Sequence, residues 1–289
     1  MEQKTPLYKA LDMEEFLDIW FYHPLGFRIA LLGKRLALSA DQVTYASMFL
    51  GIAGGLMLSR ASVIWWGYAL LIISSVLDSA DGQLARMTGK SSERGRILDG
   101  MIGYFTFTCA YLGLCLLYLS NPEHAHGAVF IFSLAIISGM FTAVQSSLYD
   151  FYRTSFSSIV TKAKVEMHNE SEKLSWFFKF CYSGYHVYQK MFASSHLAAM
   201  AAMVSKTGPD GRVPDSVRAL YRKTNKPMVR MWNLLGDNTR FLAIAAVLIL
   251  YRPELYFFFI IIVVSLLAAV LIMVQRYKDY KFITELRGL

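Results

Sequence analysis

Three aspartates in one short stretch of the sequence have the residue types and spacing of a metal-binding site. Asp78 and Asp81 are three residues apart, so on a helix they would point to one side, one turn apart. Asp99 begins the next apolar run, which puts a third carboxylate at the same depth if a short turn intervenes. Three such carboxylates suit Mg²⁺ or Mn²⁺, hard cations that prefer oxygen ligands and commonly hold phosphates.

The residues beside these carboxylates would suit a phosphorylated ligand. Gly82, Gly95 and Gly100 leave room where a ligand or nucleotide must come close, and Arg86 supplies a cation for a phosphate. The alternative is a solvated helix end with a capping aspartate. We favour the metal site, because an acidic cluster at the membrane edge is costly unless it has a function.

The same stretch resembles the signature of the CDP-alcohol phosphotransferases, also called CDP-alcohol phosphatidyltransferases. That signature reads Asp, two residues, Asp-Gly, two residues, Ala-Arg, eight residues, Gly, three residues, Asp, three residues, Asp. Seven fixed positions match in type and spacing, which makes the resemblance specific: Asp78, Asp81, Gly82, Ala85, Arg86, Gly95 and Asp99. The position of the last Asp holds Gly103.

The resemblance implies a six-helix enzyme, usually a homodimer, that transfers a substituted phosphate from a CDP-linked donor to a hydroxyl group and releases CMP. With CDP-diacylglycerol as the donor, the implied acceptors are inositol, inositol phosphate, glycerol phosphate or serine. The family roles carry over to matching positions only. Three residues would hold the metal, with Asp99 also in the catalytic set: Asp78, Asp81 and Asp99. Four residues would contact the donor: Gly82, Ala85, Arg86 and Gly95.

The glycine at position 103 is the one departure from the signature. In the family, the last Asp is understood to take the proton of the acceptor hydroxyl and to help hold a second metal ion. Gly103 can do neither. Either another group is the base, or the chain binds its ligand without turnover, or the glycine is an engineered replacement. A divergent transferase of phosphoinositol ceramide type and a non-catalytic lipid or nucleotide binder are therefore kept as alternatives.

Polar residues also gather at the end of the fourth apolar run, between Gln145 and Arg153. Family members often carry an arginine near the matching end of a later span, where it resembles a contact to the acceptor phosphate, and Arg153 corresponds to it. Asp150 is the candidate replacement base. The alternative is that both are charged residues reaching for the interface at a helix end.

The composition predicts an all-α polytopic membrane protein. The 289 residues are 55% hydrophobic and 15% aromatic, and the mean hydropathy is +0.38. Six apolar runs have about the length that crosses a bilayer: Val43–Leu58, Val63–Leu84, Ile97–Leu119, Ala128–Leu148, Leu234–Tyr251 and Pro253–Val274. Ser39 or Asp41 is expected to cap the first. No inverted repeat or pair of broken helices indicates a transporter.

The distribution of Lys and Arg predicts the orientation. They cluster at both termini, in the loop of the aspartates and between the fourth and fifth runs, with only Arg60 and Arg252 elsewhere. By the positive-inside rule, the termini and the site face the cytoplasm, across the inner membrane if the source is bacterial. The net charge of +8 is explained by anionic lipids and requires no nucleic acid. The three cysteines lack metal spacing and indicate no disulfide framework.

Four segments are expected along the chain. Residues 1–38 form an interfacial segment in which Pro24 breaks the helical run, and no cleavable signal peptide is evident. Residues 39–150 hold four spans and the motif, residues 151–233 a cytoplasmic helical insertion, and residues 234–289 the last two spans. The insertion could be a helical lobe resting on the membrane, or its cations could contact anionic lipid or substrate: Lys173, Lys179, Lys190, Arg222, Lys223 and Lys226.

Overall fold

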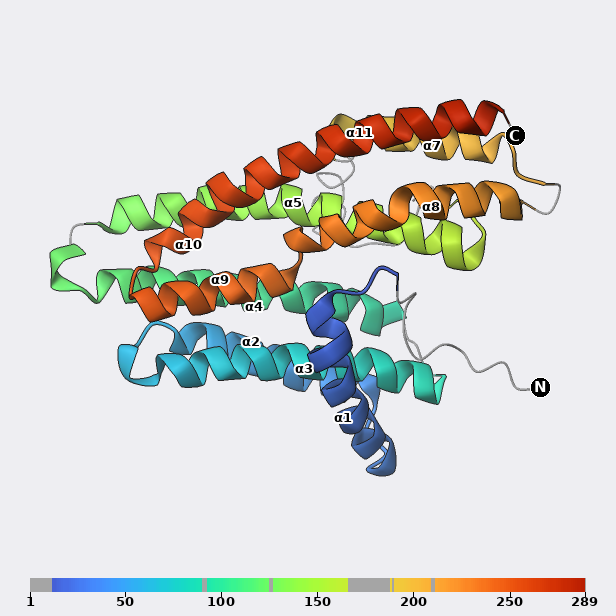
Figure 1. Cartoon of the computed structure of the whole chain (residues 1–289). Helices are drawn as coiled ribbons and strands as arrows, with labels where there is room; N and C mark the ends of the chain where they lie inside the picture. The colour runs from blue at the N-terminus through green and yellow to red at the C-terminus, as the bar shows by residue number, and fades with distance from the viewer. Residues whose placement is uncertain are drawn as a thin grey trace. The chain divides into compact units, whose positions relative to one another are not determined.

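The computed structural model of the chain describes residues 12–89, 93–124, 127–165, 188, 190–208 and 211–288, with backbone alone over 93–102. Within that part of the chain every regular element is a helix (Figure 1). Four helical stretches there are long and apolar enough to cross a membrane: Ala61–Thr88, Ala128–Lys162, Asp215–Leu250 and Glu254–Arg287. The prediction of an all-α polytopic membrane protein is confirmed.

The other two expected spans are also helices, but they are shorter or less apolar. Helix α2, Ala40–Met57, has 18 residues, and helix α4, Glu93–Leu119, has an apolar part at Gly103–Leu119. A total of six spans therefore stays a prediction.

The chain divides into two compact units, and each is described by itself. The first comprises Glu15–Ile137 and Arg240–Phe258; the second comprises residues 12–14, Ser138–Thr239 and Phe259–Leu289. Besides α2 and α4, the first unit contains η1 (Asp18–Tyr22), α1 (His23–Arg35), η2 (Ala61–Val63), α3 (Ile64–Thr88), η3 (Pro122–His124) and α10 (Glu254–Phe258). The second contains α7 (Ser194–Val204), α8 (Asp215–Trp232), η4 (Asn233–Leu235), η5 (Phe259–Val264) and α11 (Ser265–Arg287). Helices α5 (Ala128–Lys162) and α9 (Asp237–Leu250) contribute residues to both units.

Glycines let α2 approach both α3 and α4 in the first unit. A Cβ atom on Gly54 would lie 2.7 Å from the Gly67 carbonyl oxygen of α3, and one on Gly55 would lie 2.6 Å from the Ala110 nitrogen of α4. Only residues without a side chain permit such backbone contact, as at close helix crossings in membranes. The start of α2 is set locally by a capping box, in which Ser39 Oγ accepts from the Gln42 nitrogen and Gln42 Oε1 from the Ser39 nitrogen. Of the two expected caps, Ser39 is the one used.

Helix α1 packs on α3 and lies at a steep angle to α2 and α3 (Figure 1). The contact is close at Gly26, where a Cβ atom would lie 2.9 Å from Ser79 Oγ, and His23 Nδ1 lies 2.9 Å from the same oxygen. The expected break at Pro24 is wrong. The preceding turn η1 is a π-helix that leads directly into α1, and Pro24 stands in the first turn of α1, where a missing N–H costs little.

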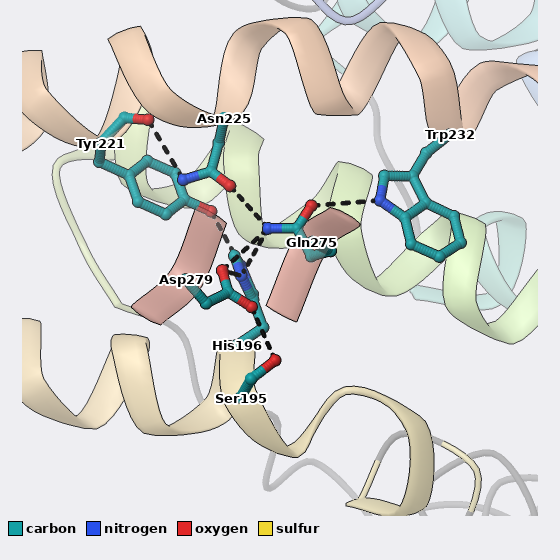
Figure 2. A network of polar contacts seen from close by, with 7 residues as sticks. All are labelled: Ser195, His196, Tyr221, Asn225, Trp232, Gln275 and Asp279. Atoms are coloured by element: carbon teal, nitrogen blue, oxygen red, sulfur yellow. Dashed lines mark hydrogen bonds and ion pairs between the residues drawn. The ribbon is translucent and has the colours of Figure 1, made fainter. Parts of the chain in front are cut away.

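In the second unit, a buried polar network joins α7, α8 and α11 (Figure 2). The His196 Nδ1 atom lies 2.8 Å from Asp279 Oδ1, and its Nε2 atom lies 3.0 Å from the Tyr221 hydroxyl. Ser195 Oγ donates to the other carboxylate oxygen of Asp279 at 2.9 Å, and Gln275 Nε2 donates to Oδ1 at 2.8 Å. The side chains of His196 and Asp279 are each 1% exposed, so the pair is shielded from water on all sides.

The network extends through Gln275 to two further residues of α8. Gln275 Nε2 donates to Asn225 Oδ1 at 2.8 Å, and Trp232 Nε1 donates to Gln275 Oε1 at 3.3 Å. Tyr152 of α5 stacks on Trp232 at 4.3 Å between ring centroids and meets the His196 ring edge-on at 5.1 Å. The network therefore also supports the turn of α5 that carries Arg153.

Candidate active site

Helix α3 carries Asp78 and Asp81 one turn apart, as their spacing predicts. Asp81 is 4% exposed, and the Thr44 hydroxyl of α2 donates to its Oδ2 atom at 2.6 Å. Asp78 is half-buried. A buried carboxylate has to be stabilised by partners, and a hydroxyl donor together with a bound cation would do this. Thr44 was not among the expected site residues, because a partner 37 residues away leaves no local pattern.

Gly82 of the Asp-Gly pair lies beside the side chain of Arg86. A Cβ atom on Gly82 would lie 3.5 Å from Arg86 Nη1 and 3.9 Å from Nη2, so the guanidinium of Arg86 folds back over Gly82. Arg86 is otherwise exposed, and Ala85 is half-buried on the same helix. The arrangement brings a cation to the backbone beside the acidic turn.

Helix α4 begins close to the motif and contains the remaining positions. Only the backbone of Gly95, Asp99 and Gly100 is described, so the convergence of the Asp99 carboxylate with Asp78 and Asp81 stays a prediction. Gly103 is described and half-buried, and a Cβ atom there would meet none of the described side chains within 4 Å. Those side chains therefore leave space where the family signature has its last Asp.

The second group of expected residues lies on one turn of α5 in the second unit. Arg153 Nη2 donates to Glu14 Oε2 at 2.8 Å, and its Nη1 donates to the Tyr149 hydroxyl. The Glu14 side chain is 2% exposed and that of Arg153 is 19% exposed. Asp150 is exposed on the same turn. Glu14 was missed from the sequence, since an acidic N-terminal stretch gives no sign of which cation it will meet.

Two cations of α8 are paired as well. Asp12 Oδ1 lies 2.6 Å from Lys226 Nζ, and Asp12 Oδ2 accepts from Arg222 Nε at 2.8 Å. Burial raises the pKa of Asp12, but hydrogen bonds and the charges of both cations outweigh burial and hold this pKa below its ordinary value. Lys223 is exposed on α8.

The chain is similar to known proteins over the part that holds these residues. Residues 37–205, more than half of the chain, match the model of the CDP-alcohol phosphatidyltransferase family. A phosphatidylinositol phosphate synthase of Mycolicibacterium smegmatis is 30% identical over 92 residues, which are 32% of this chain and 38% of the relative.

A second curated relative extends the similarity. A phosphatidylinositol phosphate synthase of Cutibacterium acnes is 24% identical over 140 residues, which are 48% of this chain and 64% of the relative. The matches thus cover less than two thirds of either relative's own length. No solved structure matches the chain. The motif residues of α3 and α4 fall inside the matched region, and the chain belongs to the CDP-alcohol phosphatidyltransferase family.

Proposed function

We propose that this protein is an integral-membrane phosphotransferase of phospholipid biosynthesis that uses a CDP-linked donor and an alcohol acceptor. The acceptor hydroxyl oxygen bonds to the donor phosphorus that carries the lipid, the bond from that phosphorus to the CMP oxygen breaks, and CMP leaves. The hydroxyl proton passes to a base. The single observation that carries the proposal is the pair Asp78 and Asp81 on one face of α3, with Asp81 buried against Thr44.

A divalent cation, Mg²⁺ or Mn²⁺, fits the donor set of this site. Asp78, Asp81 and Asp99 offer carboxylate oxygens, the ligands that such hard ions prefer. When bound, the ion would neutralise pyrophosphate charge and stabilise the departing oxygen. Asp81 is oriented by Thr44, and Arg86, folded over Gly82, would hold a phosphate of the donor.

Different observations support the identity of the donor and that of the acceptor. CDP-diacylglycerol is the donor we propose, because an interfacial site lets a lipid and a water-soluble partner each stay in its own phase. The two relatives are named for making phosphatidylinositol phosphate, which favours inositol phosphate among the possible acceptors. In this proposal Arg153 binds the acceptor phosphate, and Gly95 and Ala85 shape the donor site. We further propose that the protein is a homodimer and that the site and both termini face the cytoplasm.

Proton transfer is the step on which the proposal departs from the family signature. Gly103 has no group that accepts a proton, so we propose that Asp150 is the base. The space beside Gly103 favours a second candidate function, a lipid or nucleotide binder without turnover, since no atom of the described side chains lies within 4 Å of its Cβ position.

Binding of the donor tests the site apart from turnover. The purified protein in lipid nanodiscs should bind CDP-diacylglycerol with an affinity that depends on Mg²⁺, and Asp78→Asn or Asp81→Asn should abolish that dependence while the fold persists. Asp215→Asn, which removes an exposed carboxylate of α8, is the matched control. Release of CMP on addition of inositol phosphate then separates the transferase from the binder, and unchanged donor binding in both Asn variants would contradict either function.

A further inference from the structure

The short segment 12–14 is attached to the rest of the second unit at three successive residues. Asp12 pairs with Arg222 and Lys226 of α8, the Met13 carbonyl accepts from Asn233 Nδ2 at 3.1 Å, and Glu14 pairs with Arg153 of α5. Each contact joins residues more than 130 positions apart in the sequence. The segment therefore holds its place through tertiary contacts, three of which are ion pairs.

The two carboxylates of this segment contact three of the cations that an anionic ligand would use. A carboxylate presents two oxygens to a guanidinium in nearly the geometry of a phosphate, and Arg binds both groups in the same way. Glu14 is the more telling of the two, since its carboxylate is almost fully buried against Arg153. The protein thus places an acidic group of its own where a phosphate group would be recognised.

We propose that residues 12–14 are an internal competitor that occupies the anion site of Arg153 and must be displaced by a phosphate-bearing acceptor. This inference rests on the role proposed above for Arg153. The Glu14 pair with Arg153 has no net charge, so it attracts a phosphate less strongly than Arg153 alone. Displacement exposes Glu14 to water, and because Asp12 and Met13 are attached beside it, the whole segment is expected to loosen together.

Competition predicts a selective response to the acceptor. A phosphate dianion is attracted to Arg153 more strongly than a single carboxylate is, so it can displace Glu14. An alcohol without a phosphate has no anionic group that could replace Glu14. The segment would therefore favour phosphorylated over unphosphorylated acceptors. In the opposite case, Glu14 would hold Arg153 in its binding orientation. Removing the Glu14 charge would then weaken the binding of inositol phosphate, whereas competition predicts that it strengthens binding.

The test compares the full-length protein with Glu14→Gln in nanodiscs, using inositol phosphate as the probe and calorimetry for its affinity. Gln keeps the size of the side chain and removes its charge, so competition predicts binding tighter by about tenfold, within the range of roughly 5- to 150-fold usual for coupled sites. Asp215→Asn, which removes the carboxylate paired with Arg218 on α8, should leave the affinity unchanged. Weaker or equal binding by Glu14→Gln, or no binding by either protein, overturns the proposal.

A second measurement needs no substitution. Hydrogen exchange of residues 12–18 in the native protein should accelerate when inositol phosphate is added and should not respond to unphosphorylated inositol. Slower or unchanged exchange with the phosphate contradicts displacement. Neither readout depends on catalysis, so a failure of the proposed transferase activity would appear separately, as absent CMP release from a protein that still binds inositol phosphate.

Discussion

The Thr44 hydroxyl donates a 2.6 Å hydrogen bond to Oδ2 of Asp81, and both side chains are buried between α2 and α3. Thr44→Val keeps the shape of the side chain and removes the donor. We expect a loss of about 1–3 kcal/mol in the free energy of unfolding, because a buried carboxylate oxygen loses a partner. Thermal unfolding in detergent measures it, and Thr44→Ser, which keeps the hydroxyl, is the control. Equal stability of the Val and Ser variants would show that this bond has no energetic role.

Restoring an aspartate at position 103 tests the missing base. A Cβ atom at Gly103 meets none of the described side chains within 4 Å, so we expect Gly103→Asp to be accommodated. We expect CMP release to rise by roughly a hundred- to ten-thousand-fold, the usual contribution of general-base catalysis, with little change in donor affinity. Gly103→Asn, of the same size but unable to accept the proton, is the control. Equal and substantial rates with Gly and Asp would show that this protein never needed a carboxylate there.

Acid should weaken the ion pairs that Asp12 makes with Arg222 and Lys226. The pKa of Asp12 in the folded protein is lower than the ordinary 3.8, so its ion pairs contribute stability that is present above that value. This contribution is lost as the pH falls through the folded pKa. Asp12→Asn should therefore lower Tm at about pH 6, and the difference from the native chain should shrink as the pH approaches about 3. A difference that persists at the lower pH would mean that the carboxylate charge is not responsible.

The buried pair of His196 and Asp279 should be strongly coupled. Removing one partner leaves an uncompensated polar or charged group, so Asp279→Ala is expected to cost about 3–5 kcal/mol of stability. The double variant His196→Ala with Asp279→Ala should cost less than the sum of the single changes. Tyr280→Phe, on an exposed neighbour in α11, should change little. Additive effects of the two alanine substitutions would refute the coupling.

Cysteine labelling tests the sidedness of the insertion. On a background without native cysteines, Ser216→Cys, exposed at the start of α8, should react with a membrane-impermeant reagent only from the cytoplasm. Ser120→Cys, exposed after α4 in a turn without Lys or Arg, should react only from the opposite side. Reversed labelling of the pair would overturn the orientation derived from the basic residues.

Local features of this protein could be read from the sequence, because helix periodicity and capping act over a few residues. The three-residue spacing placed Asp78 and Asp81 on one side of α3, and Ser39 was one of the two caps expected at the start of α2. Composition and the lengths of the apolar runs were sufficient for an all-α membrane protein, since a run of about twenty apolar residues is typical of a helix that crosses a bilayer. The motif also indicated the family, with Gly103 as its one departure. Pro24 misled, because a π-turn before it lets the helix continue.

Tertiary packing decided which side chains meet across long separations. Thr44 reaches Asp81 because glycines let α2 approach α3. The sequence near Asp81 does not predict that partner. Glu14 finds Arg153 across 139 positions, and His196 finds Asp279 across 83. Such pairs depend on how helix faces pack, and the sequence around each residue fits many possible partners equally well. Only the folded chain selects one partner, because a buried charge or polar group must be paired where it is withdrawn from water.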